Sequence, residues 1–356
     1  MPIVSTIASD SKLHTRGRIS SFRGCLGVCL LLDSPDSLNT VYEDFILGLF
    51  SKYKVERSRL VYKAADLREK LPLSNTTRFT NALEEFYTSL LDIKYLSIVI
   101  FYTTFNTKKL PNVTYYGRSR TPTKVVKTLD FINELSNYYN YICAWKVQKV
   151  LSLKSCNIFL DSFEGEVTNS WNELKRNHVI KIYMRGDQCN PLIASADLVT
   201  RFVDEILALR RLKLDGNGIE ELLEEYGNER VYLYYIGQSD LIDIVPALDE
   251  PIPIYKYLHQ PSVFLLSEGI IKREKLWFEK SAVYDKVLNF ASEIGGGFKR
   301  VDLEKDYTYI MHNSDSYLIY QGDKGHKEAE YIKKLYPIKI VGLDEIKPRA
   351  INNRNL

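Results

Sequence analysis

The sequence predicts an α/β protein in which a mixed sheet with flanking helices is followed by a second, smaller α/β part. Apolar, β-branched runs alternate with amphipathic stretches of helical period along the chain. A hydrophobic content of 45%, with 12% aromatic residues, is enough to build real cores. Because 356 residues exceed the roughly 150 of an average domain, we expect two domains, 1–227 and 228–356, the second for recognition or assembly.

In the first part, composition and spacing mark each element. The run Tyr95–Phe105 is the richest in β-branched and aromatic residues, which is typical of a strand. A Ser37 cap and apolar residues at helical spacing predict a helix from there to Tyr53. We expect strands or extended segments at Ile3–Ala8, Gly24–Leu32, Arg59–Tyr62, Tyr95–Phe105, Asn157–Leu160 and Val179–Met184. We expect helices at Ser37–Tyr53, Thr80–Leu91, Thr123–Leu151, around Trp171, at Ala196–Leu212 and at Ile219–Tyr226, with a loop at Lys108–Pro122.

The second part repeats the alternation. We expect strands at Val231–Ile236, Ser262–Leu266, Tyr307–Met311, Tyr317–Tyr320 and Ile338–Val341, and helices at Lys275–Ile294 and Lys327–Leu335. Residues 246–261 hold four of the twelve prolines, which indicates a surface connection. The three glycines 295–297 lack a following Lys-Ser or Lys-Thr, so they indicate a helix end and turn rather than a nucleotide site.

Charge and cysteine content limit the class of protein. The net charge is only +3, but basic residues exceed acidic ones in residues 1–154 and the reverse holds in 155–356. The basic portion favours a polyanionic partner, although ordinary solvated lysines would give the same pattern. The apolar runs are shorter than the roughly 20 residues of a membrane span, so we expect a cytoplasmic protein without membrane contact. Five scattered cysteines indicate buried free thiols rather than disulfides or zinc.

Three aspartates are the main candidates for chemistry. Asp10 and Asp161 each end an apolar run that is expected to be a strand, and ligands of α/β proteins bind at the carboxyl ends of strands. Asp197 is expected in the first turn of a helix, pointing away from the apolar stripe of that helix. Each acid also has an ordinary explanation, as a strand end, a turn residue or a first-turn acid that complements the helix dipole.

The order of these motifs resembles an uncharacterised RNase-H-like family of the domain-of-unknown-function type. Members of that family open with a strand ending in Tyr-Ile-Asp-Glu-Ser and close with a helix starting Leu-Gln-Leu-Ala-Asp-Leu. The matching segments here are Ile7–Ser11, Arg59–Leu67, Asp92–Ile100, Asn157–Asp161 and Ile193–Leu198. The resemblance covers about residues 3–212, and it implies an RNase-H-like sheet with Asp10, Asp161 and Asp197 as catalytic metal ligands for Mg²⁺ or Mn²⁺.

The pattern departs from that family at two positions. Ser11 stands where the family has an acid, and Ala194 stands where it has glutamine. A site for two metal ions generally needs about four carboxylates, so three fit one ion better than two. A fourth ligand could come from Glu164, Glu166, Asp187, Asp130 or Glu134, and the sequence does not choose among them.

Basic residues near these motifs suggest contacts with nucleic acid. Lys12, Arg16 and Arg18 follow the first aspartate. Arg118, Arg120 and Lys124 alternate with tyrosines and could pair with phosphates while the rings stack on bases, or they could belong to a solvated loop. We therefore carry two hypotheses: a metal-dependent nuclease, or a catalytically inactive accessory subunit that binds nucleic acid or a partner protein in an antiviral defence or mobile-element complex.

Overall fold

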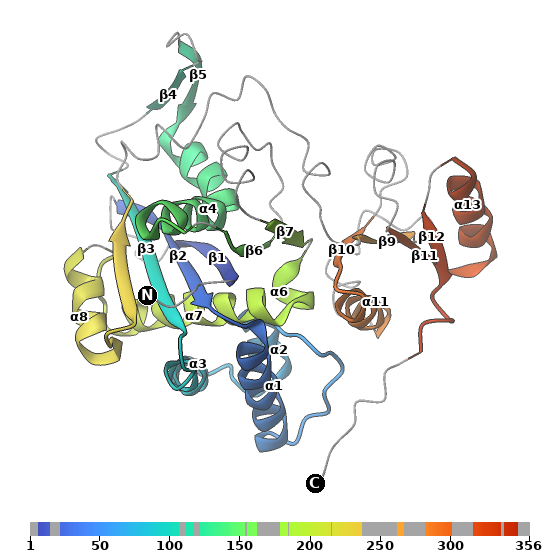
Figure 1. Cartoon of the computed structure of the whole chain (residues 1–356), viewed down its shortest axis with the longest axis horizontal. Coiled ribbons are helices and arrows are strands. Elements are labelled where there is room, and N and C mark those ends of the chain that lie inside the picture. Colours follow the sequence, from blue (N-terminus) through green and yellow to red (C-terminus); the bar gives the residue numbers. More distant parts are fainter. Residues whose placement is uncertain are drawn as a thin grey trace.

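The structure is a computed structural model of the chain (Figure 1). It describes residues 6–14, 22–106, 112–116, 122–153, 155–161, 179–183, 185–214, 216–236, 262–266, 282–300, 316–335 and 338–347. Within these ranges, no helix is both long enough and apolar enough to cross a membrane.

A six-stranded mixed sheet forms the first part of the molecule, in the order β7-β6-β1-β2-β3-β8. Its strands are β1 (Thr6–His14), β2 (Phe22–Leu32), β3 (Ser97–Asn106), β6 (Asn157–Asp161), β7 (Val179–Tyr183) and β8 (Val231–Tyr235). The first three form an antiparallel meander, while β6 and then β7 continue the sheet in parallel beside β1. A meander extended by parallel strands beside its first strand is the RNase-H-like arrangement, so the expected fold class is confirmed.

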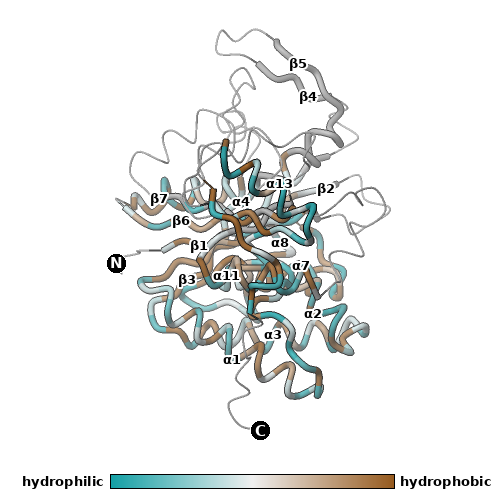
Figure 2. Tube along the Cα trace, turned by 90° about the vertical axis from the view of Figure 1, so that its right-hand side faces the viewer, coloured by the Kyte–Doolittle hydropathy of each residue, from teal (hydrophilic) through white to brown (hydrophobic). Residues whose placement is uncertain are grey.

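Helices cover both faces of this sheet. They are α1 (Pro35–Lys52), α2 (Ala64–Lys70), α3 (Thr76–Leu91), α4 (Thr128–Leu151), α6 (Gly186–Cys189), α7 (Pro191–Leu209) and α8 (Gly216–Tyr226). Alternation along β1 separates the two faces: Ser9 bonds to Asn140 of α4, whereas Ala8 joins the apolar core that contains α7. In Figure 2, hydrophobic and hydrophilic residues alternate along α1 and α3, as expected for helices with one buried side.

Two helices begin earlier than the sequence analysis expected. Ser34 and Asn190 cap α1 and α7, each with a proline at the first helical position, where a missing N–H is tolerated. Asp197 therefore lies in the second turn of α7 rather than in the first. The strand β1 also runs on past Asp10 to His14 because it stays paired with β2.

Two further expectations were wrong. The region expected to be a loop at Lys108–Pro122 contains β4 (Asn112–Tyr116), which pairs with β5 (Pro122–Lys127), so α4 starts only at Thr128. The strand β8, expected in the second part, pairs with β3 at the edge of the first sheet. A domain boundary at residue 227 stays a prediction, because residues 237–261, between β8 and the second sheet, are outside the described ranges.

A smaller parallel sheet follows, in the order β10-β9-β11-β12. It contains β9 (Ser262–Leu266), β10 (Gly297–Arg300), β11 (Tyr317–Tyr320) and β12 (Lys339–Gly342), with the helices α11 (Ala282–Glu293) and α13 (Gly322–Leu335). The turn after α11 includes Gly295 at a φ of 67°, which confirms the expected helix end. The segments expected around Trp171 and at Tyr307–Met311 lie outside the described residues. All five cysteines are free and buried, as expected.

Candidate functional site

Asp10 and Asp161 lie side by side where two parallel strands end their pairing. The printed register of β1 and β6 runs from Thr6 opposite Asn157 to Ser9 opposite Leu160, and the next residues are Asp10 and Asp161. Ala8 and Phe159, two residues earlier, both point into the core on the α7 side of the sheet. Because side chains alternate along a strand, both aspartates point to that same side, on strands roughly 4.8 Å apart.

A third aspartate, Asp187, comes from the short helix α6 that follows β7. The backbone N–H of Gly186 donates to Asp161 Oδ1 at 2.6 Å, which ties the start of α6 to the end of β6. Arg185, just before it, adopts a left-handed conformation at φ 54°, so the chain turns sharply there. This turn brings Asp187 close to Asp10 and Asp161.

Asp197 approaches the same place from α7. Its Oδ2 accepts a hydrogen bond of 2.6 Å from the backbone N–H of Ala64, the first residue of α2. The preceding residue, Lys63, places its Nζ 3.3 Å from Asp187 Oδ2. The start of α2 therefore contacts two of the four acids, one through a backbone donor and one through an ammonium group.

The electrostatics of the acids show that all four lie near one another. Burial raises the pKa of Asp10 well above its usual range, and the charges of Asp197, Asp187 and Asp161 raise it further. Burial and then Asp187 raise the pKa of Asp197 to about 6, against the opposing effects of Ala64 N–H, Lys63 and Lys12. These carboxyl groups therefore repel one another and favour binding of protons or cations.

The charges of these carboxylates also change the pKa of Lys63. Burial alone would lower its pKa, but the carboxylates of Asp187, Asp66, Asp197 and Asp161 outweigh burial and raise it above its ordinary value. Its ammonium group is therefore charged at neutral pH. It offsets part of the negative charge of the four acids.

The donor set fits a hard divalent cation, because Mg²⁺ and Mn²⁺ prefer carboxylate oxygens. The side-chain arrangement itself is wider than a closed metal shell: within the described ranges, no group of three or more His, Cys, Asp or Glu residues stands close enough to hold one ion. Asp161 and Asp197 each turn one oxygen toward a backbone N–H, and Asp187 turns one toward Lys63. Binding an ion would require these carboxylates to rotate inward.

Five acids were candidates for a fourth member of the site, and the structure brings one of them, Asp187, close to the other three. Glu164 and Glu166 lie outside the described residues. Asp130 and Glu134 belong to α4, but their side chains are not described. Ser11, which replaces the family acid, points to the opposite face and accepts a hydrogen bond from Asn140 N–H, so its hydroxyl group does not join the site.

Of the basic residues expected to contact nucleic acid, one has a described side chain. Lys12 pairs with Asp204 of α7 at 2.7 Å. Arg16, Arg18, Arg118 and Arg120 lie outside the described residues, and Lys124 lies on β5 without a described side chain. Their proposed contacts stay predictions. The sequence analysis missed Lys63, although it stands within the Arg59–Leu67 segment that carried part of the family resemblance.

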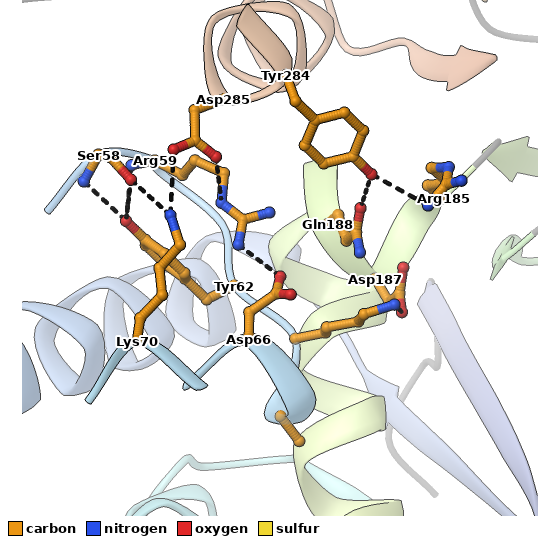
Figure 3. A network of polar contacts seen from close by, with 12 residues as sticks. Ser58, Arg59, Tyr62, Asp66, Lys70, Arg185, Asp187, Gln188, Tyr284 and Asp285 are labelled. Carbon is orange, nitrogen blue, oxygen red and sulfur yellow. Dashed lines mark hydrogen bonds and ion pairs between the residues drawn. The ribbon is translucent and has the colours of Figure 1, made fainter. Parts of the chain in front are cut away.

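A polar network supports the site from the side of α11 (Figure 3). The buried guanidinium group of Arg59 pairs with Asp66 at 2.6 Å and with Asp285 of α11 at 3.1 Å. Lys70 reaches the other oxygen of Asp285 at 3.1 Å. The segment that carries Lys63 and Ala64 is thus fixed to α11 by Arg59, which precedes α2, and by Lys70, the last residue of α2.

Comparisons with known proteins agree with an uncharacterised family. A family model described as "Domain of unknown function (DUF8203)" matches residues 7–255. An "Uncharacterized protein" of Archaeoglobus fulgidus is 33% identical over 346 residues, covering 96% of this chain and 98% of that protein.

Two solved structures are similar at low level. One is RNase HII of Archaeoglobus fulgidus, from its complex with PCNA, with a TM-score of 0.30 and 13% identity over 63% of this chain and 79% of that chain. The other is ribonuclease H2 of Pyrococcus horikoshii OT3, with a TM-score of 0.29 and 12% identity over 64% and 80%. The family model covers well over half of the residues, so this chain belongs to the DUF8203 family of unknown function.

Proposed function

We propose that this protein is a metal-dependent nuclease in which Asp10, Asp161, Asp187 and Asp197 hold Mg²⁺ or Mn²⁺. The observation that carries the proposal is the approach of four aspartates, which raises the pKa of Asp10 and of Asp197: Asp10 and Asp161 on the adjacent strands β1 and β6, Asp187 on α6 and Asp197 on α7. An isolated cluster of this charge is unfavourable in a folded protein unless protons or cations neutralise it. Carboxyl groups with perturbed pKa values that gather in one place are typical of functional sites.

When bound, a divalent ion would activate water and stabilise the oxygen that leaves a phosphodiester. The residues of the chain would hold this ion and fix the orientation of its carboxylate ligands. Asp10 and Asp161 present carboxylates from adjacent strands, while Ala64 N–H fixes Asp197 and Gly186 N–H fixes Asp161. Lys63 keeps a positive charge beside Asp187, where it can attract a phosphate oxygen and limit repulsion between the substrate and the acids.

A second candidate function is a catalytically inactive accessory subunit that binds nucleic acid or a partner protein, for instance in a defence or mobile-element complex. Ser11 in place of the family acid favours it, as does the spacing of the described acids, which is wider than a closed metal shell. In either case, the five free thiols fit the cytoplasmic location that we expect.

A cleavage assay separates the two functions. Wild type and Asp161→Asn are incubated with single- and double-stranded DNA and RNA in Mg²⁺ or Mn²⁺. The nuclease proposal predicts cutting by wild type, a loss of at least about 100-fold in Asp161→Asn, and no change in Asp44→Asn, an exposed position on α1. Absence of cutting on every substrate, together with absence of Mn²⁺ uptake in calorimetry, would favour the accessory function.

A further inference from the structure

Beyond the four aspartates, α7 contains two acids that are almost completely buried. Asp204 is 2% exposed and Glu205 is 0% exposed. A buried carboxylate is stable only when cations or hydrogen-bond donors compensate it. Among the groups that compensate them are three basic side chains from three different elements, Lys12 of β1, Arg68 of α2 and Arg201 of α7.

These five residues form one chain of alternating charge. Asp204 Oδ2 lies 2.7 Å from Lys12 Nζ and 3.9 Å from Arg201 Nη1. Glu205 Oε1 lies 2.6 Å from Arg201 Nη2 and 3.5 Å from Arg68 Nη1. Each acid is shared by two bases, so the three cations are close neighbours, with Arg201 in the middle.

The carboxylates of Asp204 and Glu205 are buried, whereas the three basic side chains are partly exposed. The side chains of Lys12, Arg201 and Arg68 are 30%, 22% and 31% exposed, whereas the two carboxylates are hidden beneath them. Of these five residues, the bases therefore reach the protein surface while the acids do not, and the three bases exceed the two acids by one charge. We call Lys12, Arg201 and Arg68 the cationic row.

Each residue of the cationic row lies a few residues beyond a residue of the aspartate site on the same element. Lys12 is two residues beyond Asp10 on the same face of β1, and Arg201 is four residues beyond Asp197 on α7. Arg68 is four residues beyond Ala64, whose N–H binds Asp197. One helical turn rises about 5.4 Å, while a nucleic-acid strand in a duplex advances about 3.4 Å per nucleotide, so the row lies about one to two nucleotides from the aspartates.

The two guanidinium groups are held before any ligand arrives. Both pack against the buried ring of Phe79, whose centroid lies 5.3 Å from Arg68 Cζ and 5.9 Å from Arg201 Cζ. Glu205 fixes both from beneath. The buried Nε of Arg201 has no hydrogen-bond partner within the described part of the chain. Groups already ordered in this way lose little side-chain entropy when they bind an anion.

We propose that the cationic row binds the sugar-phosphate backbone of a nucleic-acid strand and leads that strand to the four aspartates. The inference rests on the proposed function in one respect, because the strand bound here is the one that the aspartates would cut. Contacts to phosphate are independent of base sequence, so the row sets affinity and register rather than specificity. Lysine and arginine are the side chains suited to phosphate, and paired guanidinium groups suit it best.

The test is equilibrium binding of a labelled single-stranded oligonucleotide, measured by fluorescence anisotropy over a series of salt concentrations. All proteins carry Asp161→Asn, so that cleavage does not interfere. Arg68→Gln is expected to weaken binding about 5- to 20-fold at low salt and to reduce the slope of log K against log salt by about 0.7, the value for one phosphate contact on a single strand. Arg68→Lys is expected to keep most of the slope.

The matched control is Arg210→Gln, which also removes an arginine paired with a glutamate, Glu225, but at the C-terminal end of α7, about 20 Å along the helix axis from Asp197. Thermal unfolding of each variant checks that it folds. If Arg201→Gln does not fold, Lys12→Gln and Arg68→Gln, whose side chains are more exposed, answer the question. Row variants that match the parent in affinity and slope would overturn the inference, even if the wild-type protein cleaves nucleic acid.

Binding without cleavage would separate this inference from the nuclease proposal. A protein that never cuts but binds the oligonucleotide through the row would keep this inference and remove the nuclease proposal. A protein that binds no single-stranded or double-stranded oligonucleotide would overturn the inference directly.

Discussion

Tyr284 of α11 donates a hydrogen bond to the side-chain oxygen of Gln188, the residue that follows Asp187. The same hydroxyl group accepts from Arg185 Nη1 at 3.1 Å. One turn later on α11, Asn289 accepts from Leu60 N–H and donates to Ser58 C=O. The helix α11 of the second sheet therefore touches both segments that frame the aspartates, the one that carries Asp187 and the one that leads to Lys63 and Ala64 (Figure 3).

Replacing Tyr284 by Phe tests the first of these contacts. The ring of Tyr284, a residue that is 1% exposed, would still fill its buried place, but Gln188 and Arg185 would each lose a hydrogen-bond partner. We expect a loss of about 1–3 kcal/mol in the free energy of unfolding and faster amide hydrogen exchange at residues 185–190. The matched control is Tyr331→Phe, whose side chain is 59% exposed. Equal stability of both variants would show that α11 does not hold α6.

The ion pairs of Asp285 should contribute more than a surface pair. Asp285→Asn leaves Arg59, which is 2% exposed, with one carboxylate partner instead of two. The new asparagine would also place a neutral amide beside the charged groups of Arg59 and Lys70. We expect destabilisation by about 1–3 kcal/mol in chemical unfolding. In contrast, Glu85→Gln removes the partner of Lys52 where both side chains are more than half exposed, and we expect less than about 0.5 kcal/mol. An equal loss of stability in Asp285→Asn and Glu85→Gln would contradict the greater contribution that we assign to the buried pairs.

The stability of the metal-free protein should rise as the pH is lowered toward 4. A carboxyl group with a higher pKa in the folded state binds its proton more tightly there, so protonation favours folding. Asp197, with a pKa of about 6 against roughly 3.9 when unfolded, contributes between pH 6 and pH 4 with a slope of up to about 1.4 kcal/mol per pH unit. The check is a set of melting curves in a chelating agent.

Asp197→Asn is the control for that pH dependence. An asparagine oxygen can still accept from Ala64 N–H, but the group no longer titrates. We expect the variant to be more stable than wild type at pH 7 in the chelating agent and to lack the rise between pH 6 and pH 4 that Asp197 produces. Parallel melting curves of the two proteins over this range would mean that burial and Asp187 do not raise the pKa of Asp197.

The glycine at the start of α6 leaves room for the site. A Cβ at Gly186 would lie 2.5 Å from Ile193 Cδ1 and 3.4 Å from Asp161 Oδ1. Gly186→Ala should therefore lower the melting temperature and weaken Mn²⁺ binding measured by calorimetry. Gly48→Ala, in the exposed face of α1 with nothing within 4 Å, should instead stabilise the protein by about 0.5–1 kcal/mol. Unchanged Mn²⁺ binding by Gly186→Ala would show that the turn at the start of α6 does not affect the metal site.

Local signals predicted much of the fold. Apolar runs placed most of the strands, because a strand buried on both faces is apolar throughout. The helix starts at Ser37 and Ala196 were expected too late, although Ser34-Pro35 and Asn190-Pro191 are helix-start signals that the sequence contains. The position of β8 was not readable, because its sequence fits either sheet and its pairing with β3 joins residues more than a hundred positions apart.

The site was predicted in part for the same reason. Asp10 and Asp161 follow apolar runs, and that local pattern is visible in the sequence. The approach of Asp187 depends on the left-handed turn at Arg185, and that of Lys63 depends on where α2 docks on α7. Both are results of tertiary packing, which composition and periodicity do not encode.

The most direct measurement is the anomalous diffraction of crystals grown in Mn²⁺. The proposed function predicts a manganese peak among Asp10, Asp161, Asp187 and Asp197, with carboxylate oxygens from at least three of them within about 2.0–2.3 Å, and no peak in crystals of Asp161→Asn. A wild-type crystal with ordered carboxylates and no manganese among them, at Mn²⁺ concentrations well above those that support known metal nucleases, would contradict it.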